Sequence, residues 1–365
     1  MIRRLSSFLK APNKRTLWRY FLREVGSDLQ RKCLPFFSSA ANLPVSADGK
    51  LNLSDSLCTS YGDHRSGWAF AIKSLKPLHH PAGILFDSFI EQTFAWDPKR
   101  AIRPHLQPWI GVIHVPPHVP GWFPGHQSNQ SVFNSEAWKA SYPYCKGLFT
   151  LSAYHQRALL KTLDIPVNSL LHPTDFNVKP WRWDQFDRNP EKKIVQVGWW
   201  LRKLYSIYQL PAKSYQKIFL RKDETGMDDI LKGELEHTVG NENLTPGQIA
   251  STRVMAYLSA RKYDRLLSEN IVFLDLHDAS ANNTILECMA RNTPVLVNRI
   301  EPVTEYLGEN YPFYFTSLEE AANKAEDTQL VKSTHEYLLH HPFKTHFTGH
   351  FFRQSMMNTA IYQSL

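Results

Sequence analysis

The clearest alternation of apolar and polar positions lies in residues 269–299. Residues 271–276 form a bounded apolar run, and turn and capping residues fill positions 277–282. A helical pattern follows, Asn292-Thr293-Pro294 must end it, and the chain becomes apolar again at 295–297. This pattern predicts a strand, a polar loop, a short helix and a second strand, which together form one βαβ unit of an α/β protein.

Further apolar runs predict buried strands at residues 83–86, 109–115, 145–151, 193–198 and 254–258. Helices are predicted at residues 69–75, 153–163 (after the capping residue Ser152) and 263–267. Residues 222–250 are polar and broken by glycines and a proline, so we expect an extended insertion or loop there.

The composition is that of a soluble protein with two domains. A chain of 365 residues with 42% hydrophobic content can bury a sizeable core. The net charge of +8 is concentrated in residues 1–32. This segment has nine Lys and Arg residues and only two acidic residues, Glu24 and Asp28, which gives a local net charge of +7. Because the remainder is nearly neutral and carries no recognisable binding motif, we expect no nucleic-acid partner.

The basic N-terminal arm also has an apolar stripe, formed by Leu17, Phe21, Val25 and Leu29. Such a helix either lies on an anionic membrane surface or packs on its own domain. No stretch is long enough for a membrane-spanning helix, and residues 1–12 lack the features of a signal peptide. We therefore expect a cytoplasmic protein, with a peripheral position at the inner membrane surface as the second option. The cysteines are scattered and predict neither a zinc site nor a disulfide framework: Cys33, Cys58, Cys145 and Cys288.

The loop of the βαβ unit is the first candidate binding site. In open α/β sheets, ligands bind beyond the carboxyl ends of the strands, and a helix that begins near Asn283 or Thr284 offers N–H groups to an anion. Glu287 lies within one turn of that start and can accept hydrogen bonds from hydroxyls such as a ribose diol. The alternative is purely structural, since Thr284 to Glu287 also fits a capping box.

This segment resembles the donor-sugar segment of retaining GT-B glycosyltransferases, the large group-1 family. The residues that carry the resemblance are Asn283-Thr284-x-x-Glu287-Cys-Met-Ala, followed by Thr293-Pro-Val-Leu-Val297. The resemblance implies two Rossmann-like domains facing a cleft, with Glu287 on the ribose of a nucleotide sugar. The family usually has a second acidic residue eight positions earlier, where this chain has Ala279, so Asp278 is expected to take that role. Asn282 completes the expected donor site.

A second candidate site follows the strand at residues 193–198. Gly198 permits close approach of a ligand to the backbone, and Arg202 and Lys203 can clamp a diphosphate. The resembled family places its phosphate-binding Arg and Lys shortly after this strand. The alternative for this pair is two exposed basic residues at a helix start.

The first domain offers candidates on the acceptor side. His114 and His118 follow the predicted strand 109–115, where an α/β cleft places ligands, and the resemblance favours His114 as the catalytic residue. The glycine-flanked loop that ends at Gly67 resembles the GT-B loop facing the cleft. Trp122 is expected to flank an acceptor sugar.

These observations predict an α/β protein of two Rossmann-like domains. The expected units are the basic arm 1–32, an acceptor domain 33–180, a linker 181–192, a donor domain 193–334, and a helical tail 335–365 that returns to the first domain. We expect transfer of a sugar from a nucleotide diphosphate sugar to a glycan, lipid or protein hydroxyl. The alternatives are a nucleotide-sugar epimerase and a non-catalytic sugar-nucleotide-binding protein.

The proposed chemistry needs no cofactor. Arg202, Lys203 and the helix start near Asn283 are expected to stabilise the leaving diphosphate. The chain contains no Asp-x-Asp motif. We therefore expect protein cations in place of Mg²⁺, and no metal site.

Overall fold

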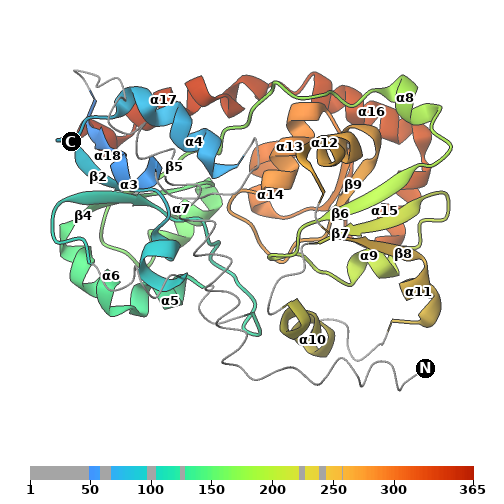
Figure 1. Cartoon of the computed structure of the whole chain (residues 1–365), viewed down its shortest axis with the longest axis horizontal. Coiled ribbons are helices and arrows are strands. Elements are labelled where there is room, and N and C mark those ends of the chain that lie inside the picture. Colours follow the sequence, from blue (N-terminus) through green and yellow to red (C-terminus); the bar gives the residue numbers. More distant parts are fainter. Residues whose placement is uncertain are drawn as a thin grey trace.

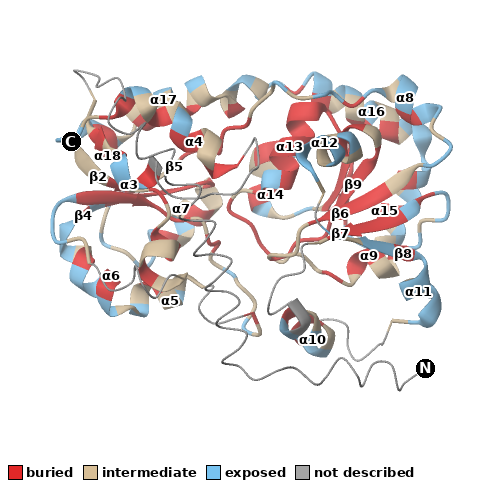
Figure 2. Ribbon diagram, in the orientation of Figure 1, coloured by how far each residue is buried: buried red, intermediate tan, exposed pale blue. Residues whose placement is uncertain are grey.

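The computed structural model describes residues 49–57, 67–96, 104–123, 128–221, 227–237, 244–256 and 258–365. These residues form two parallel β-sheets, each with its own surrounding helices, which lie side by side in Figure 1. The strands are mostly buried, whereas the helices alternate between buried and exposed faces (Figure 2). This pattern is expected of parallel sheets, because their connections cover the faces of the sheet with helices. The basic arm 1–32 lies outside the described residues.

The first sheet has five strands in the order β1-β2-β3-β4-β5, and all neighbours pair in parallel. The strands are β1 (Leu51–Asn52), β2 (Ile84–Asp87), β3 (Trp109–Val112), β4 (Cys145–Thr150) and β5 (Val167–Ser169). The helices between these strands include α4 (Trp68–Leu75), α5 (Asn129–Asn134), α6 (Glu136–Ser141) and α7 (Ala153–Leu159). Ser152 caps α7, as predicted, by accepting a hydrogen bond from the His155 amide.

The second sheet has six strands in the order β11-β10-β9-β6-β7-β8, also all parallel. They are β6 (Lys193–Val197), β7 (Gln216–Leu220), β8 (Thr252–Met255), β9 (Ile271–Leu274), β10 (Val295–Asn298) and β11 (Tyr314–Phe315). The predicted βαβ unit is present as β9, α13 (Asn283–Arg291) and β10. Asn292 ends α13 in the left-handed conformation at φ 60°, which explains why the helix stops there.

The other helices of this half are α9 (Ser206–Gln209), α10 (Met227–His237), α11 (Pro246–Ala250), α12 (Ala260–Glu269), α14 (Glu301–Leu307), α15 (Leu318–Glu326) and α16 (Thr328–Leu339). The expectation of an extended insertion at 222–250 was therefore wrong for the described part, which contains α10 and α11. Glu234 attaches α10 to the loop between β6 and α9, because its carboxylate accepts hydrogen bonds from the amides of Leu204 at 2.7 Å and Tyr205 at 3.0 Å.

The segment 181–192 is also not an open linker. It contains α8 (Trp183–Asp187), and the side chains of Trp181 and Phe186 belong to the core of the second half. The Trp181 indole donates to the backbone oxygen of Asn270 at 3.1 Å. The chain has therefore already joined the second half before residue 193.

The C-terminal segment spans both halves. After α16, the chain runs along one edge of the molecule to α17 (Gly349–Met357), which packs on α4, and to α18 (Ala360–Gln363), beside β5 (Figure 1). Phe352, Met356 and Ile361 enter the core of the first half. The structure thus places residues 349–363 in the first half. None of the helices in the described ranges is long and apolar enough to cross a membrane.

Candidate active site

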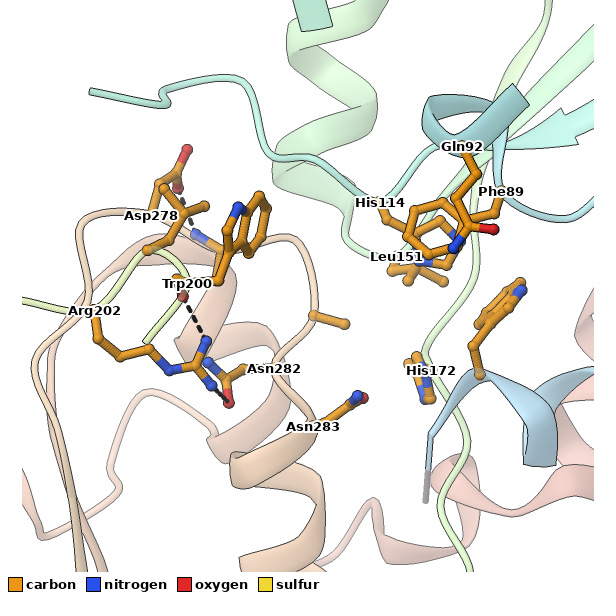
Figure 3. A pocket seen from close by; sticks show the side chains of 14 residues that line it. Phe89, Gln92, His114, Leu151, His172, Trp200, Arg202, Asp278, Asn282 and Asn283 are labelled. Carbon is orange, nitrogen blue, oxygen red and sulfur yellow. Dashed lines mark hydrogen bonds between the residues drawn. The ribbon is translucent and has the colours of Figure 1, made fainter. Parts of the chain in front are cut away.

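A cavity of about 300 Å³ lies between the two halves. Most of its lining follows the carboxyl ends of strands β2, β3, β4, β5, β6 and β9, where α/β folds bind ligands. Figure 3 shows residues of the second half facing residues of the first across this space. The lining residues are Trp68, Phe89, Gln92, His114, Leu151, His172, Trp200, Leu201, Arg202, Asp278, Ala279, Ala281, Asn282 and Asn283.

Arg202 is the cation of this cavity. Its guanidinium donates to the backbone oxygens of Trp200 at 2.6 Å and Val197 at 3.3 Å, and to the side-chain oxygens of Asn282 and Thr284, both at 3.4 Å. Burial lowers the pKa of Arg202 to about 10, so the group stays protonated at neutral pH. Among the described residues, no carboxylate forms an ion pair with it. The Glu287 carboxylate favours its charge from nearby, but all of these hydrogen bonds go to neutral oxygens. Such a partly buried cation is suited to an anionic ligand.

The loop between β6 and Arg202 brings the backbone close to this guanidinium. Gly198 has φ +77°, and a Cβ there would lie 3.5 Å from the guanidinium carbon of Arg202. Gly198 itself does not line the cavity, but it supports the position of Arg202. Its left-handed backbone is one that residues with side chains rarely adopt.

Helix α13 presents its N-terminus to the same end of the cavity. Asn282 is the N-cap, and its side-chain oxygen accepts hydrogen bonds from the amides of Thr284 at 3.0 Å and Ile285 at 3.3 Å. The capping-box alternative was therefore wrong, because Thr284 lies inside the helix and its hydroxyl accepts from Arg202 instead. Asn283, the first residue of the helix, lines the cavity.

Glu287 lies deeper, behind the cavity wall, and is 3% exposed. Its carboxylate accepts a 2.5 Å hydrogen bond from the hydroxyl of Tyr263 on α12. Burial raises the pKa of Tyr263 well above its usual value, so this phenol stays a donor. Since Glu287 caps no helix, its buried carboxylate has no role in starting α13.

Lys203 is placed differently from its neighbour. Its ammonium lies 2.9 Å from the carboxylate of Asp275, which also accepts from the Ser206 hydroxyl at 2.7 Å. Lys203 does not line the cavity. The structure therefore separates the two adjacent basic residues: Arg202 faces the cavity, and Lys203 balances a nearly buried aspartate.

His114 lies on the opposite wall. Its Nε2 lies 3.0 Å from the backbone oxygen of Ser88, and its ring packs on Phe89 and Trp68 with centroid distances of 4.1 and 4.5 Å. Burial lowers the pKa of His114 to about 3, so the ring is neutral at pH 7. Glu91 fixes the backbone, because one carboxylate oxygen accepts from the amides of both His114 and Val115 at 2.6 Å.

Several residues of this wall were not predicted from the sequence: Trp68, Phe89, Gln92, Leu151 and His172. His172 follows β5 just as His114 follows β3. Its position after a strand was the feature of the sequence that could have indicated a place in the site. Trp68 directly follows the predicted Gly67, which is the N-cap of α4 and does not itself line the cavity. The rest of the glycine-flanked loop, residues 60–66, lies outside the described part of the chain.

Asp278 lines the cavity and also joins the two halves. Its carboxylate accepts from the amide of His118 at 2.9 Å and from the hydroxyl of Tyr154 at 3.2 Å. The His118 side chain is 74% exposed and lies outside the cavity lining. Trp122 is also outside the lining, with its ring 5.4 Å from that of His277.

Further contacts hold the halves together beside the cavity. The Glu305 carboxylate on α14 accepts from the amides of Ala153 and Tyr154 in the first turn of α7, both at 2.7 Å. The Tyr306 hydroxyl donates to the backbone oxygen of Leu151 at 2.5 Å and accepts from the His172 amide at 3.1 Å. Helix α14 therefore positions two lining residues that belong to the opposite wall.

No family model and no curated protein matches this sequence. Several solved structures share its fold. One is a UDP-forming α,α-trehalose-phosphate synthase from Burkholderia vietnamiensis, with 11% identity, a TM-score of 0.51, and coverage of 81% of this chain and 75% of the other. The E. coli trehalose-6-phosphate protein bound with UDP-2-fluoro glucose has 12% identity, a TM-score of 0.52, and coverage of 81% and 77%.

A third structure is the Anabaena protein HepE in complex with UDP-glucose, with 14% identity, a TM-score of 0.53, and coverage of 77% of this chain and 79% of the other. At such low identity, these similarities establish the fold alone, and the chemistry has to be argued from the residues of the site. The predicted fold class is confirmed: this chain has the GT-B fold, two Rossmann-like domains that face each other across a cleft.

Proposed function

We propose that this chain is a glycosyltransferase, which moves a sugar from a nucleotide diphosphate sugar to an acceptor hydroxyl. One observation carries the proposal: the partly buried Arg202 cation, hydrogen-bonded to neutral oxygens beside the start of α13, faces a cavity between the two domains of a GT-B fold. Two solved structures with this fold are complexes, one with UDP-2-fluoro glucose and the other with UDP-glucose. The diphosphate of such a sugar nucleotide is negatively charged, and Arg202 would bind this charge.

Arg202 would stabilise the leaving diphosphate. A guanidinium has five N–H donors, and four hydrogen bonds to protein oxygens leave at least one for a phosphate oxygen. The positive end of α13 at Asn283 would add a second favourable interaction with the same charge. Fixed charges that need no reorganisation during the reaction can supply most of the catalysis of such a transfer.

Glu287 would hold the ribose of the donor. A buried carboxylate within one helical turn of the anion site can accept hydrogen bonds from neighbouring hydroxyls. Tyr263 orients that carboxylate through its 2.5 Å hydrogen bond. Asp278, with a pKa raised by burial, would stand near the donor where the resembled family has its other acidic residue.

We further propose that a hexose is transferred with retention of configuration, as the resemblance to the group-1 family implies. His114 would lie near the reacting sugar, since it faces Arg202 across the cavity (Figure 3). Because its ring is neutral, it would act through a hydrogen bond and not as a cation. Analysis of the product's anomeric configuration by NMR tests retention directly.

Metal independence is part of the proposal. Arg202 and the α13 start would take the place that Mg²⁺ holds beside a diphosphate in other enzymes. We expect turnover to survive an excess of EDTA. Complete loss of turnover, with recovery on addition of Mg²⁺ or Mn²⁺, would contradict this part of the proposal.

The acceptor is proposed to be a glycan, lipid or protein hydroxyl in glycan or polysaccharide synthesis. The basic arm would bring the protein to an anionic cytoplasmic membrane surface, because each basic residue there contributes on the order of 1 kcal/mol to binding. Deleting residues 1–15 removes five basic residues and no acidic one. We expect weaker vesicle binding with unchanged turnover of a soluble acceptor. Vesicle binding that the deletion leaves unchanged would rule out this role.

Incubation with radiolabelled sugar nucleotides tests the proposed function. A glycosyltransferase transfers the label to an acceptor or to water and releases the nucleotide. An epimerase returns an altered sugar nucleotide, and a binding protein returns the donor unchanged. Either of the last two outcomes, across a panel of donors and acceptors, would contradict the proposal.

A further inference from the structure

Trp68 brings an unsatisfied hydrogen-bond donor to the first-domain wall of the cavity. Its side chain is 5% exposed, and among the described residues its indole Nε1 has no hydrogen-bond partner. Buried N–H groups without a partner are rare in native proteins, and each one calls for an explanation. Since Trp68 lines the cavity, a ligand atom is one partner that would satisfy it.

Two imidazoles on the same wall, those of His114 and His172, can accept hydrogen bonds. The Nε2 of His114 faces the Ser88 carbonyl at 3.0 Å, and the Nδ1 of His172 faces the Pro173 carbonyl at 2.7 Å. A carbonyl oxygen can only accept, so these two ring nitrogens carry the hydrogens. Burial lowers the pKa of His114 to about 3 and of His172 to about 4, so at neutral pH the other nitrogen of each ring holds a lone pair.

The three rings lie close together. The Trp68 ring centroid is 4.5 Å from that of His114 and 5.5 Å from that of His172. Figure 3 shows His114 and His172 across the cavity from Arg202 and Asn282. The three rings thus combine one donor with two acceptors, which complements neighbouring hydroxyls, since a hydroxyl both donates and accepts.

We propose that Trp68, His114 and His172 form a hydroxyl-recognition site for the transferred sugar, and that this site selects a neutral sugar over one that carries a carboxylate. The inference rests on the proposed function, because the diphosphate at Arg202 would direct its sugar toward this wall. A carboxylate can only accept hydrogen bonds, so it would meet two acceptor nitrogens. Among the described residues that line this wall, none has a cationic side chain to bind it.

The test uses the full-length protein and isothermal titration calorimetry. UDP, ADP and GDP are first compared by thermal shift, and the most stabilising nucleotide is then titrated alone, as its glucose form and as its glucuronate form. Trp68→Phe keeps an aromatic ring and removes the N–H, and His172→Phe removes the lone pair. We expect each variant to bind the glucose form about tenfold more weakly and the free nucleotide within about twofold of wild type.

Trp183→Phe is the matched control, because it makes the same change in an indole on α8, outside the cavity lining. Equal losses for the free nucleotide and its glucose form, or no loss at all, would overturn the assignment of Trp68 and His172. Wild-type protein that binds the glucuronate form as tightly as the glucose form would overturn the selectivity. If wild type binds the nucleotide but gains nothing from any sugar, the proposed function fails and this inference fails with it.

Discussion

The two walls of the cavity differ in charge and in how the sequence encodes them. The second-domain wall carries a partly buried cation and a helix start, and its key residues come from two short stretches, 198–203 and 278–287. The first-domain wall is aromatic and uncharged at neutral pH, and its residues come from five separate places after β2, β3, β4 and β5 and at the start of α4. One wall is thus suited to a diphosphate and the other to an uncharged ring with hydroxyls.

The largest effect is expected at the charged wall. Arg202→Ala should lower turnover by about 10²-fold or more, because it removes the preorganised charge beside the leaving diphosphate. The melting temperature should not fall sharply, since the variant removes a partly buried cation whose hydrogen bonds all go to neutral oxygens. The measurement is release of labelled nucleotide, beside a thermal melt.

Arg188→Ala serves as the control, because Arg188 is an exposed arginine on the outer side of the second domain, paired with Asp184 at 2.9 Å. We expect normal turnover from this variant. If Arg202→Ala also keeps turnover within a few-fold of wild type, the charged wall does not bind the diphosphate.

A smaller effect, on nucleotide binding, is expected from Glu287 of the second domain. Glu287→Gln should weaken nucleotide binding by about 10- to 100-fold, because a hydrogen bond to a charged acceptor is worth roughly 1.5–3 kcal/mol. Folding should persist, since Glu287 is not part of a cap and Gln can still accept from Tyr263. A variant that melts much earlier than wild type and yet binds nucleotide normally would show that Glu287 is structural.

The sequence predicted the sheets better than the segments between them. Buried parallel strands appear as continuous apolar runs, so β6, β9 and β10 could be placed directly. Glycine led to the main error, since Gly233 was taken as a breaker although it lies within α10. A Cβ at Gly233 would come 2.8 Å from the Trp122 ring, so glycine there permits close packing.

The site was predicted unevenly for a related reason. Asn282, Asn283 and Arg202 follow strands within compact polar motifs, and motifs of this kind can be recognised. Trp68 and Phe89 are ordinary aromatic residues in sequence, and only the fold shows that they meet around His114. Lys203 looked equivalent to Arg202 because its partner, Asp275, lies far along the chain.

The smallest expected effect is a change in how the stability of the protein depends on pH, and it arises at the first-domain wall. Burial lowers the pKa of His172 from its usual 6.5 to about 4. Because the unfolded chain takes up this proton first, the contribution of His172 to the free energy of unfolding is complete above pH 6.5 and is lost as the pH falls toward 4. Glu91 acts in the opposite sense, because burial raises its pKa to about 7 and its contribution is lost as the pH rises through 7. In His172→Gln, the melting temperature should fall less steeply between pH 6.5 and 4.

The expected difference is up to about 1.4 kcal/mol of unfolding free energy per pH unit, or about 2 °C. Arg202→Ala should keep the wild-type slope, since Arg202 does not titrate in this range. Parallel melting profiles for His172→Gln and wild type would mean that His172 does not remain neutral in the folded protein.

The central claim is that this cavity binds a nucleotide diphosphate sugar through Arg202. The most direct measurement is isothermal titration of a panel of nucleotide diphosphates and their sugars into wild type and Arg202→Ala, side by side. We predict that wild type binds at least one sugar nucleotide and that Arg202→Ala binds the same ligand at least tenfold more weakly. Absence of binding across the panel, or equal affinity in the two proteins, would contradict the claim.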